Sequence, residues 1–113
     1  MGPSVLTIAT TGGGPESRVS VTGGVVIDTS PQLRTALLEA IRTRLGPVLV
    51  VDMSGVSYLD TSGVATLLEA SRLARAHAVH LRVVGLTGEP EMLARILEMD
   101  GIFLALGSEV EFR

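Results

Sequence analysis

Apolar residues in the first quarter of the chain come in two short runs that are rich in β-branched side chains. Residues 4–10 (SVLTIAT) and 18–27 (RVSVTGGVVI) have the composition and loose alternation typical of strands. The Gly- and Pro-rich segment between them, residues 10–17, favours a β-hairpin with a loose connection. It lacks the lysine and the following helix of a phosphate-binding loop, so we interpret the glycines as a hairpin loop.

The next apolar positions change to a helical spacing. Ser30 is a suitable N-cap, and Pro31 is tolerated at the first helical position because its missing N–H would be unpaired there anyway. Gly46 and Pro47 are expected to end this helix. The predicted core face repeats every fourth residue at Leu33, Leu37, Ile41 and Leu45.

The second half of the chain continues the alternation of strand and helix. Residues 48–52 (VLVVD) form a short apolar run typical of a buried central strand that ends at Asp52. Residues 62–76 predict a second helix, with an inward face of Val64, Leu67, Leu68, Ser71 and Ala74. Residues 80–85 predict another strand.

The C-terminal part predicts one more helix and a last strand. Residues 89–101 read as a short helix closed by Gly101, and residues 102–106 as a closing strand. The apolar residues expected to face inward from this helix are Met92, Leu93, Ile96 and Leu97.

This order of elements predicts an α/β fold. Helical crossovers place neighbouring strands in parallel, whereas the opening hairpin is antiparallel. We therefore expect a single domain over residues 1–113, with a mixed sheet of four to five strands and helices packed against it.

Composition limits the possible partners and compartments. A net charge of −3 and 3% aromatic residues disfavour nucleic-acid binding. Without cysteine the chain has no disulfides or thiol chemistry. The first residues do not resemble a signal peptide, and no apolar run approaches the ~20 residues of a membrane-spanning helix. We expect a soluble, cytoplasmic protein that does not insert into membranes.

Three acidic residues are expected where predicted strands end. Asp28, Asp52 and Asp60 should gather at the carboxyl edge of the sheet, where ligands and partners of α/β proteins usually bind. For each one alone, helix capping is the simpler interpretation.

Catalytic chemistry finds little support. His77 and His80 lie near the far end of the second helix, without a third metal ligand close in sequence. Residues 55–59 (GVSYL) do not complete a nucleophile elbow. We expect neither catalytic residues nor a metal or cofactor, so the chain is predicted not to be an enzyme.

The junction Asp60-Thr61-Ser62-Gly63 places two hydroxyls at a predicted helix N-terminus. Unpaired N–H groups and the helix dipole there would tolerate an added phosphoryl group. Such a group adds about −1.5 to −2 charges. The site therefore has the properties of a switch that changes a docking surface without changing the fold.

The segment from Asp52 to Val64 resembles the signature of STAS domains, the family of sulfate transporters and anti-sigma factor antagonists. That signature is Asp, aliphatic, Ser, two or three residues, aromatic, aliphatic, Asp, two hydroxyl residues, Gly, aliphatic. The likeness extends over roughly residues 19–106. The matching positions are Asp52, Met53, Ser54, Val56, Tyr58, Leu59, Asp60, Thr61, Ser62, Gly63 and Val64.

The resemblance implies a role for each residue of the junction. Thr61 stands at the family's phosphorylated Ser or Thr, and Asp28 at an acidic residue near that site. Asp60, Ser62 and Gly63 complete the partner-binding loop. Antagonists of this family bind a serine/threonine kinase-type anti-sigma factor when unmodified; the kinase ends that binding by phosphorylation, and a phosphatase restores it.

The resemblance also leaves alternatives and one departure from the pattern. Small STAS proteins serve as interaction subunits of ABC-type lipid transport complexes, in which the same corner would dock on an ATPase subunit without phosphorylation. A STAS segment of an anion transporter and a nucleotide-binding protein are further alternatives. The glycine often found before the fourth strand is replaced by AHAVH, residues 76–80.

Overall fold

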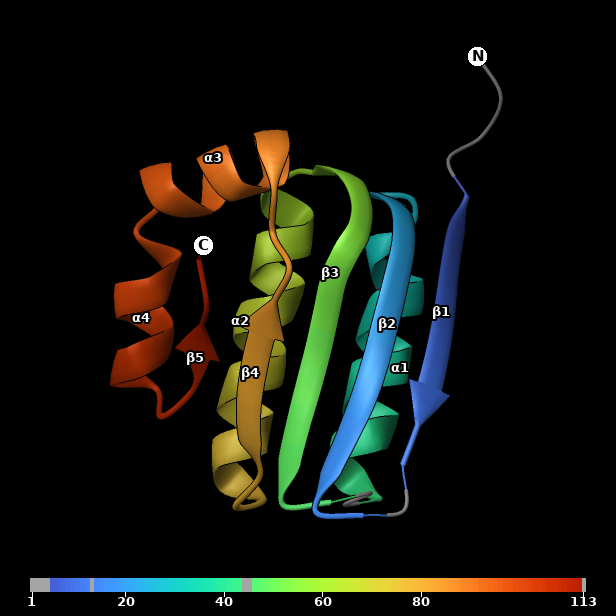
Figure 1. Cartoon of the computed structure of the whole chain (residues 1–113), viewed down its shortest axis with the longest axis vertical. Helices are drawn as coiled ribbons and strands as arrows, with labels where there is room; N and C mark the ends of the chain where they lie inside the picture. The colour runs from blue at the N-terminus through green and yellow to red at the C-terminus, as the bar shows by residue number, and fades with distance from the viewer. Residues whose placement is uncertain (1–4, 13, 44–45, 113) are drawn as a thin grey trace.

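The computed structural model describes residues 5–12, 14–43 and 46–112, and a five-stranded mixed sheet forms its centre. The strands lie in sequence order, with β1 antiparallel to β2 and the remaining pairs parallel (Figure 1). The predicted hairpin and mixed sheet are thereby confirmed. The strands are β1 Leu6–Thr11, β2 Glu16–Val25, β3 Val48–Leu59, β4 His80–Val84 and β5 Glu109–Val110.

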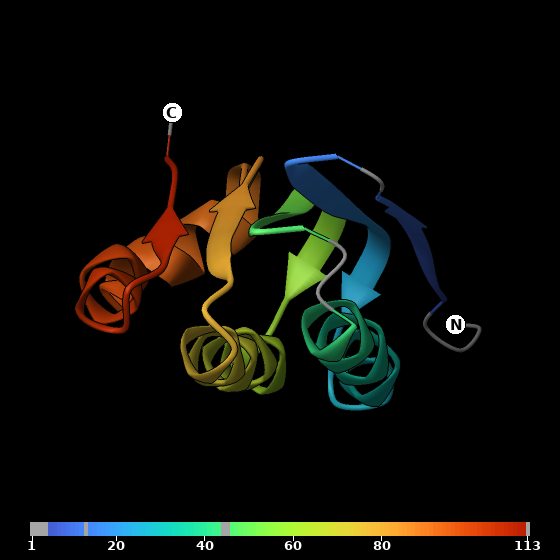
Figure 2. The same ribbon diagram turned by 90° about the horizontal axis from the view of Figure 1, so that it is seen from below.

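Helices cover only one face of this sheet. Figure 2 shows α1 (Ser30–Arg42) and α2 (Thr61–Ala76) side by side beneath the strands. The shorter helices α3 (Gly88–Ile96) and α4 (Met99–Ala105) follow β4, and α3 packs against β3 at the carboxyl end of the strands (Figure 1). None of these helices has the length and apolar character that crossing a bilayer requires, as far as the described residues show.

The core lies between the sheet and the two long helices and is almost entirely aliphatic. Alternate residues of the central strands face it, as the two-residue period of a strand dictates. Burying each such side chain contributes about 1.5–3 kcal/mol. Its principal members are Val19, Val21, Leu49, Val51, Met53, Leu81 and Val83 from the sheet, Leu33, Leu37, Ile41, Leu67, Ala70 and Ala74 from α1 and α2, and Phe103 from α4. The predicted inward faces of the first two helices are therefore correct for the described residues; Leu45 lies outside them.

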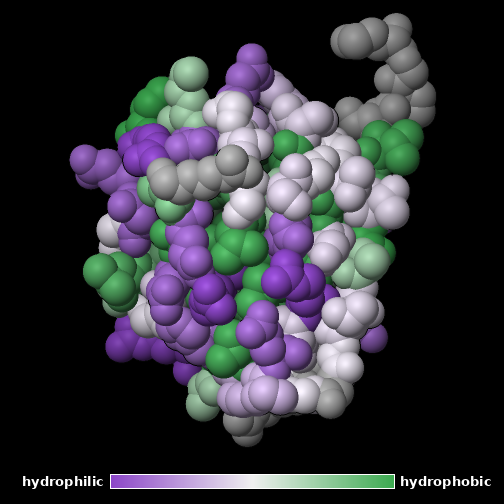
Figure 3. Space-filling view, in the orientation of Figure 1, coloured by the Kyte–Doolittle hydropathy of each residue, from purple (hydrophilic) through white to green (hydrophobic). Residues whose placement is uncertain are grey.

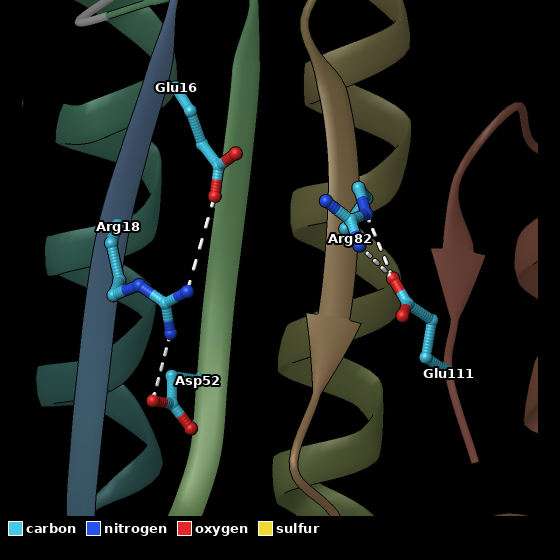
Figure 4. Close-up of polar contacts among 5 residues, drawn as sticks. All are labelled: Glu16, Arg18, Asp52, Arg82 and Glu111. Carbon is cyan, nitrogen blue, oxygen red and sulfur yellow. Dashed lines mark hydrogen bonds and ion pairs between the residues drawn. The ribbon is translucent and has the colours of Figure 1, made fainter. Parts of the chain in front are cut away.

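Hydrophilic side chains cover much of the sheet face that has no helices, with apolar side chains between them (Figure 3). Val50 is only 1% exposed there, because it pairs in register with Arg18 on one side and Arg82 on the other. Figure 4 shows Arg18 reaching Asp52, with an Nη1–Oδ2 distance of 2.9 Å, and Arg82 paired with Glu111. The aliphatic stems of long charged side chains can shield an apolar residue while their charged ends stay in water.

The third strand is longer than predicted. It does not end at Asp52 but continues through Leu59, because β2 remains its partner as far as Val25. Two register shifts accommodate the extension, and the second half needs Gly55, where an added Cβ would lie 2.7 Å from Thr22 Oγ1. The prediction that Asp52 ends a strand is therefore wrong.

The N-cap of the first helix lies one residue earlier than predicted. Thr29 is the N-cap and Ser30 is already helical, with Pro31 in the first turn. The Thr29 side chain does not cap the helix; its Oγ1 donates to Gly24 O at 2.7 Å and accepts from Val26 N at 2.9 Å. It thus fixes the turn between β2 and α1, and the hydroxyl of Ser30 is free for another role.

The C-terminal prediction fails in two respects. The predicted helix over residues 89–101 is divided at Glu98, whose φ of +53° interrupts the helical backbone. Residues 102–105 belong to α4 and Leu106 is its C-cap, so they form no strand; the last strand is β5. Because α3 turns Pro90 and Ala94 inward, its larger apolar residues Met92, Ile96 and Leu97 are exposed, contrary to the prediction.

Candidate functional site

Asp60 organises the junction between β3 and α2. Its backbone N–H donates to Val25 O at 3.1 Å, which holds the junction to the end of β2. Its Oδ1 accepts from the N–H groups of Ser62 and Gly63, at 2.9 and 3.3 Å, and from the Ser62 hydroxyl. Asp60 is therefore the N-cap of α2, as capping chemistry predicts.

The carboxylate of Asp60 is stabilised in its charged form. Partial burial by itself raises the pKa of Asp60, but hydrogen bonds from Ser62, Gly63 and the backbone N–H of Ile27 outweigh that effect and lower the pKa from its ordinary value.

A second hydroxyl joins this network from the neighbouring helix. Ser30, which is buried, donates from its Oγ to Ser62 Oγ at 3.3 Å, and its backbone N–H donates to Val26 O at 2.7 Å. Ser62 thus accepts from Ser30 and donates to Asp60. The sequence analysis missed this role of Ser30, because its pattern indicated only a helix start.

Thr61 differs from its neighbour Ser62 in both exposure and bonding. It is the first residue of α2 and is exposed, whereas Ser62 is partly buried. The Ser62 hydroxyl has two partners, the Ser30 hydroxyl and the Asp60 carboxylate, and the described residues offer none to Thr61 Oγ1. Of the two hydroxyls at this helix start, that of Thr61 is the accessible one.

Gly63 allows the first turn of α2 to lie close to the strands. An added Cβ would lie 2.5 Å from Leu59 Cδ1 and 2.7 Å from Val25 Cγ1, both shorter than real Cβ contacts. The position of Thr61 above the sheet therefore depends on the small size of the residue at position 63.

The structure separates the three acidic residues that the sequence analysis groups together. Asp28 is exposed in the turn between β2 and α1. Asp52 lies within β3 on the helix-free face. Hydrogen bonds from Ser54 lower the pKa of Asp52, and Arg18 adds to this effect. Asp52 therefore lies within a strand, apart from the Asp60 junction and outside the candidate site.

The histidines lie elsewhere. His77 is the C-cap of α2, with its Nδ1 3.1 Å from Leu73 O, and His80 in β4 has its Nε2 2.7 Å from Glu109 Oε1. In residues 5–12, 14–43 and 46–112, no group of three or more His, Cys, Asp or Glu side chains is arranged to hold a metal ion.

An open groove adjoins Thr61, and the sequence analysis did not predict it. It has a volume of about 470 Å³ and lies between the end of β3 and α3. Its signal in the sequence was the spacing of Met92 and Ile96, which indicated an apolar helix face; we predicted that this face points inward, whereas both side chains are exposed. We call it the α3 groove; its lining residues are Tyr58, Leu59, Asp60, Thr61, Glu89, Met92, Leu93 and Ile96.

Comparison with known families and proteins supports the resemblance found in the sequence. The family model described as "Mlab, STAS domain" matches residues 8–106. An anti-sigma-B factor antagonist of Listeria monocytogenes is 30% identical over 84 residues, which cover 74% of this chain and 70% of the relative. The chain therefore belongs to the STAS domain family.

Solved structures share the fold at lower sequence identity. An anti-sigma factor antagonist from Mycobacterium paratuberculosis has a TM-score of 0.72 and 22% identity, over 86% of this chain and 81% of that one. The antagonist SpoIIAA, 14% identical, matches in its unphosphorylated form (TM-score 0.68, 95% of this chain and 89% of that one). Its phosphorylated form matches with a TM-score of 0.67, over 95% and 93% of the two chains. The predicted STAS-like fold is confirmed.

Proposed function

We propose that this STAS domain is an anti-sigma factor antagonist whose binding to a kinase-type anti-sigma factor ends when Thr61 is phosphorylated. The partner-binding corner consists of Asp28, Asp60, Thr61, Ser62 and Gly63. The name of the Listeria relative supports the class of protein. The accessibility of Thr61 beside the fully bonded Ser62 is the observation that carries the choice of the modified residue.

In the proposed phosphorylation this chain supplies only the hydroxyl that is modified. Thr61 Oγ1 attacks the γ-phosphorus of ATP held by the kinase, a new O–P bond forms, and the bond to the leaving ADP breaks. The hydroxyl proton passes to a base of the kinase. This chain contributes an exposed hydroxyl on a rigid helix start, which is a substrate's role and not an enzyme's.

Two N–H groups of the helix start are already occupied in the unmodified protein. The N–H groups of Ser62 and Gly63 already bond to Asp60, so a phosphate on Thr61 cannot use them. The added charge of about −1.5 to −2 therefore projects toward the partner beside an ionised carboxylate.

The magnitude of this charge is sufficient for a switch. Two unit charges 4 Å apart at an effective dielectric near 20 interact by roughly 4 kcal/mol. Even a quarter of that value, about 1 kcal/mol, changes an affinity about fivefold. A partner that also has to strip water from the phosphate loses more.

Such a switch needs little change in fold. SpoIIAA has nearly the same similarity to this chain in its phosphorylated and unphosphorylated forms, which supports a mechanism that acts on the surface. Reversal needs a phosphatase that hydrolyses the phosphothreonine, and we propose that the whole cycle takes place in the cytoplasm.

The alternative is an interaction subunit of an ABC-type lipid transport complex that docks on an ATPase subunit through the same corner. The observation that keeps this alternative open is the exposed apolar lining of the α3 groove, which suits a constitutive interface as well as a switched one. The two functions differ in whether Thr61 is ever modified.

A labelling experiment separates them. The purified chain is incubated with the kinase-type anti-sigma factors of its source genome and ATP labelled in the γ-phosphate, and the modified residue is mapped. We expect phosphate on Thr61, no labelling of Thr61→Ala, and undiminished labelling of Ser62→Ala if that variant keeps its fold. Equal labelling of Thr61→Ala would contradict the choice of residue. Co-purification with an ATPase and no labelling by any kinase would favour the transport complex.

A further inference from the structure

We infer that the α3 groove binds a cationic amphipathic segment of the partner protein, with an apolar side chain between Tyr58, Met92 and Ile96 and a basic side chain at Glu89. This inference rests on the proposed function for the identity of its partner. The groove can bind such a segment even if Thr61 is never phosphorylated in this protein.

The groove is apolar on both walls. Met92 and Ile96 of α3 are 61% and 70% exposed, and Tyr58 of β3 is 49% exposed on the opposite side. Leu59 and Leu93 complete the apolar lining. Large apolar side chains gathered around one depression are typical of protein–protein binding sites.

The charged side chains that line the groove are negative. Among the described residues of its lining, Asp60 and Glu89 are the only carboxylic acids, and none is Arg or His. Arg95, the basic residue of α3, is held away from it: its Nε is 2.8 Å from Glu91 Oε2, and its guanidinium lies 4.2 Å from the ring centre of Phe112.

The two acids differ in availability. Asp60 already accepts hydrogen bonds from Ser62 and Gly63 within its own loop. Glu89 is exposed in the first turn of α3, and no described residue forms an ion pair with it. A basic side chain of a partner would therefore find its counter-ion at Glu89.

This pattern of charge selects among possible occupants. A nucleotide or an anionic membrane surface would be repelled by the two carboxylates. A second copy of this chain would bring the same two acids against them. A protein segment with apolar and basic residues can pack against the apolar walls and also pair with the carboxylates of the groove.

The groove also connects the occupant to the switch. Thr61 forms part of the lining, so an apolar side chain packed against Tyr58 and Ile96 would lie beside its hydroxyl. After phosphorylation the same side chain would have to displace the hydration shell of the phosphate, which opposes binding.

A peptide titration tests the groove directly. The full chain, labelled with ¹⁵N, is titrated with a short amphipathic helix of Leu and Lys, and with a matched helix of Leu and Glu. We expect amide shifts at Tyr58, Met92 and Ile96 with the basic peptide only. Shifts elsewhere, or equal shifts with the acidic peptide, would overturn the inference.

Matched variants then test the natural partner. Ile96→Ser and Leu104→Ser remove apolar side chains that are both 70% exposed, but Leu104 lies in α4 outside the groove. We expect Ile96→Ser to weaken binding of the anti-sigma factor at least tenfold, Leu104→Ser less than twofold, and Glu89→Gln to reduce the salt dependence of binding. Thermal unfolding checks that both Ser variants are folded.

The outcomes distinguish the inference from the proposed function. Suppose that Ile96→Ser binds the anti-sigma factor as tightly as Leu104→Ser, whereas Thr61→Glu does not bind it. The partner then does not occupy the α3 groove, and the proposed control of binding at Thr61 is still supported. If the unmodified chain binds no anti-sigma factor, the proposed function fails, and the peptide titration alone decides whether the groove is correct.

Discussion

The hydroxyl oxygens of Ser30 and Ser62 lie 3.3 Å apart, although 32 positions separate the two residues in the sequence. This contact joins the first turns of α1 and α2. Through Ser62 it reaches Asp60, whose Oδ1 accepts from the Ser62 hydroxyl. Ser30, Ser62 and Asp60 thus belong to one hydrogen-bonded unit that links the two helix starts.

Ser30→Ala should loosen that unit. We expect a loss of about 1 kcal/mol in the free energy of unfolding, the usual net contribution of a hydrogen bond, and weaker binding of the partner. Ser71→Ala is the control, because Ser71 bonds to Ser108 at 2.6 Å in the buried part of α2, away from the site. Urea unfolding and partner titration measure both effects; equal loss of binding in the two variants would contradict a specific role of Ser30.

Thr61→Glu should weaken partner binding without affecting folding. Thr61 is exposed and bonded to no described side chain, so its replacement removes no packing. The free energy of unfolding should change by less than about 0.5 kcal/mol, whereas the added charge opposes docking. Titration with the anti-sigma factor and urea unfolding test this prediction together. A variant that no longer unfolds cooperatively would show that Thr61 is structural.

Gly63→Ala should destabilise the fold by about 1–3 kcal/mol, since its Cβ overlaps Leu59 and Val25. Gly63→Val should destabilise the fold more than Gly63→Ala, because its side chain is larger. Gly101→Ala is the matched control: an added Cβ there meets nothing within 4 Å, so this variant should gain roughly 0.5–1 kcal/mol from helix propensity. Similar unfolding midpoints for both Ala variants would show that the first turn of α2 can shift.

Ala78→Gly should stabilise the chain. Ala78 has a φ of +57°, the left-handed conformation that glycine adopts without strain. Glycine would relieve about 1–2 kcal/mol of backbone strain, but its greater conformational freedom in the unfolded chain offsets part of this. The free energy of unfolding should therefore rise by roughly 0.5–1 kcal/mol. Thermal unfolding measures it, and Ala74→Gly in the helical backbone of α2 should lose stability instead.

Stability should fall in acid through Asp60 and Asp52. Both have a pKa below the model-compound value of 3.8 in the folded protein, so their contribution is fully present above that value and is lost as the pH falls through the lower folded-state pKa. Asp60→Asn keeps an acceptor at the cap but does not titrate, and its unfolding free energy should depend less on pH below about 4. An unchanged pH profile would place the acid sensitivity elsewhere.

The sequence predicts the fold class and the loop that carries Thr61 because both depend on local patterns. The spacing of Leu33, Leu37 and Ile41 indicates a helix whichever way it packs, and Asp60 caps α2 through atoms within three residues. Such features need no knowledge of distant contacts.

The errors arise where tertiary contacts decide. The extension of β3 beyond Asp52 depends on its pairing with β2, and the outward direction of Met92 and Ile96 depends on the small residue Ala94 packing inward. The bond between Ser30 and Ser62 joins two helices whose angle no local pattern specifies.

The unequal lengths of β3 and β4 have a consequence for how such domains diversify. The last residue of β4, Val84, pairs with Asp52, so the distal half of β3 has no strand neighbour on that side, and α3 packs against β3 instead. One wall of the α3 groove is thereby a peripheral helix and not part of the sheet. If the groove binds the partner as we infer, exchanging that helix between paralogues would redirect partner choice and leave Thr61 and its supporting framework intact.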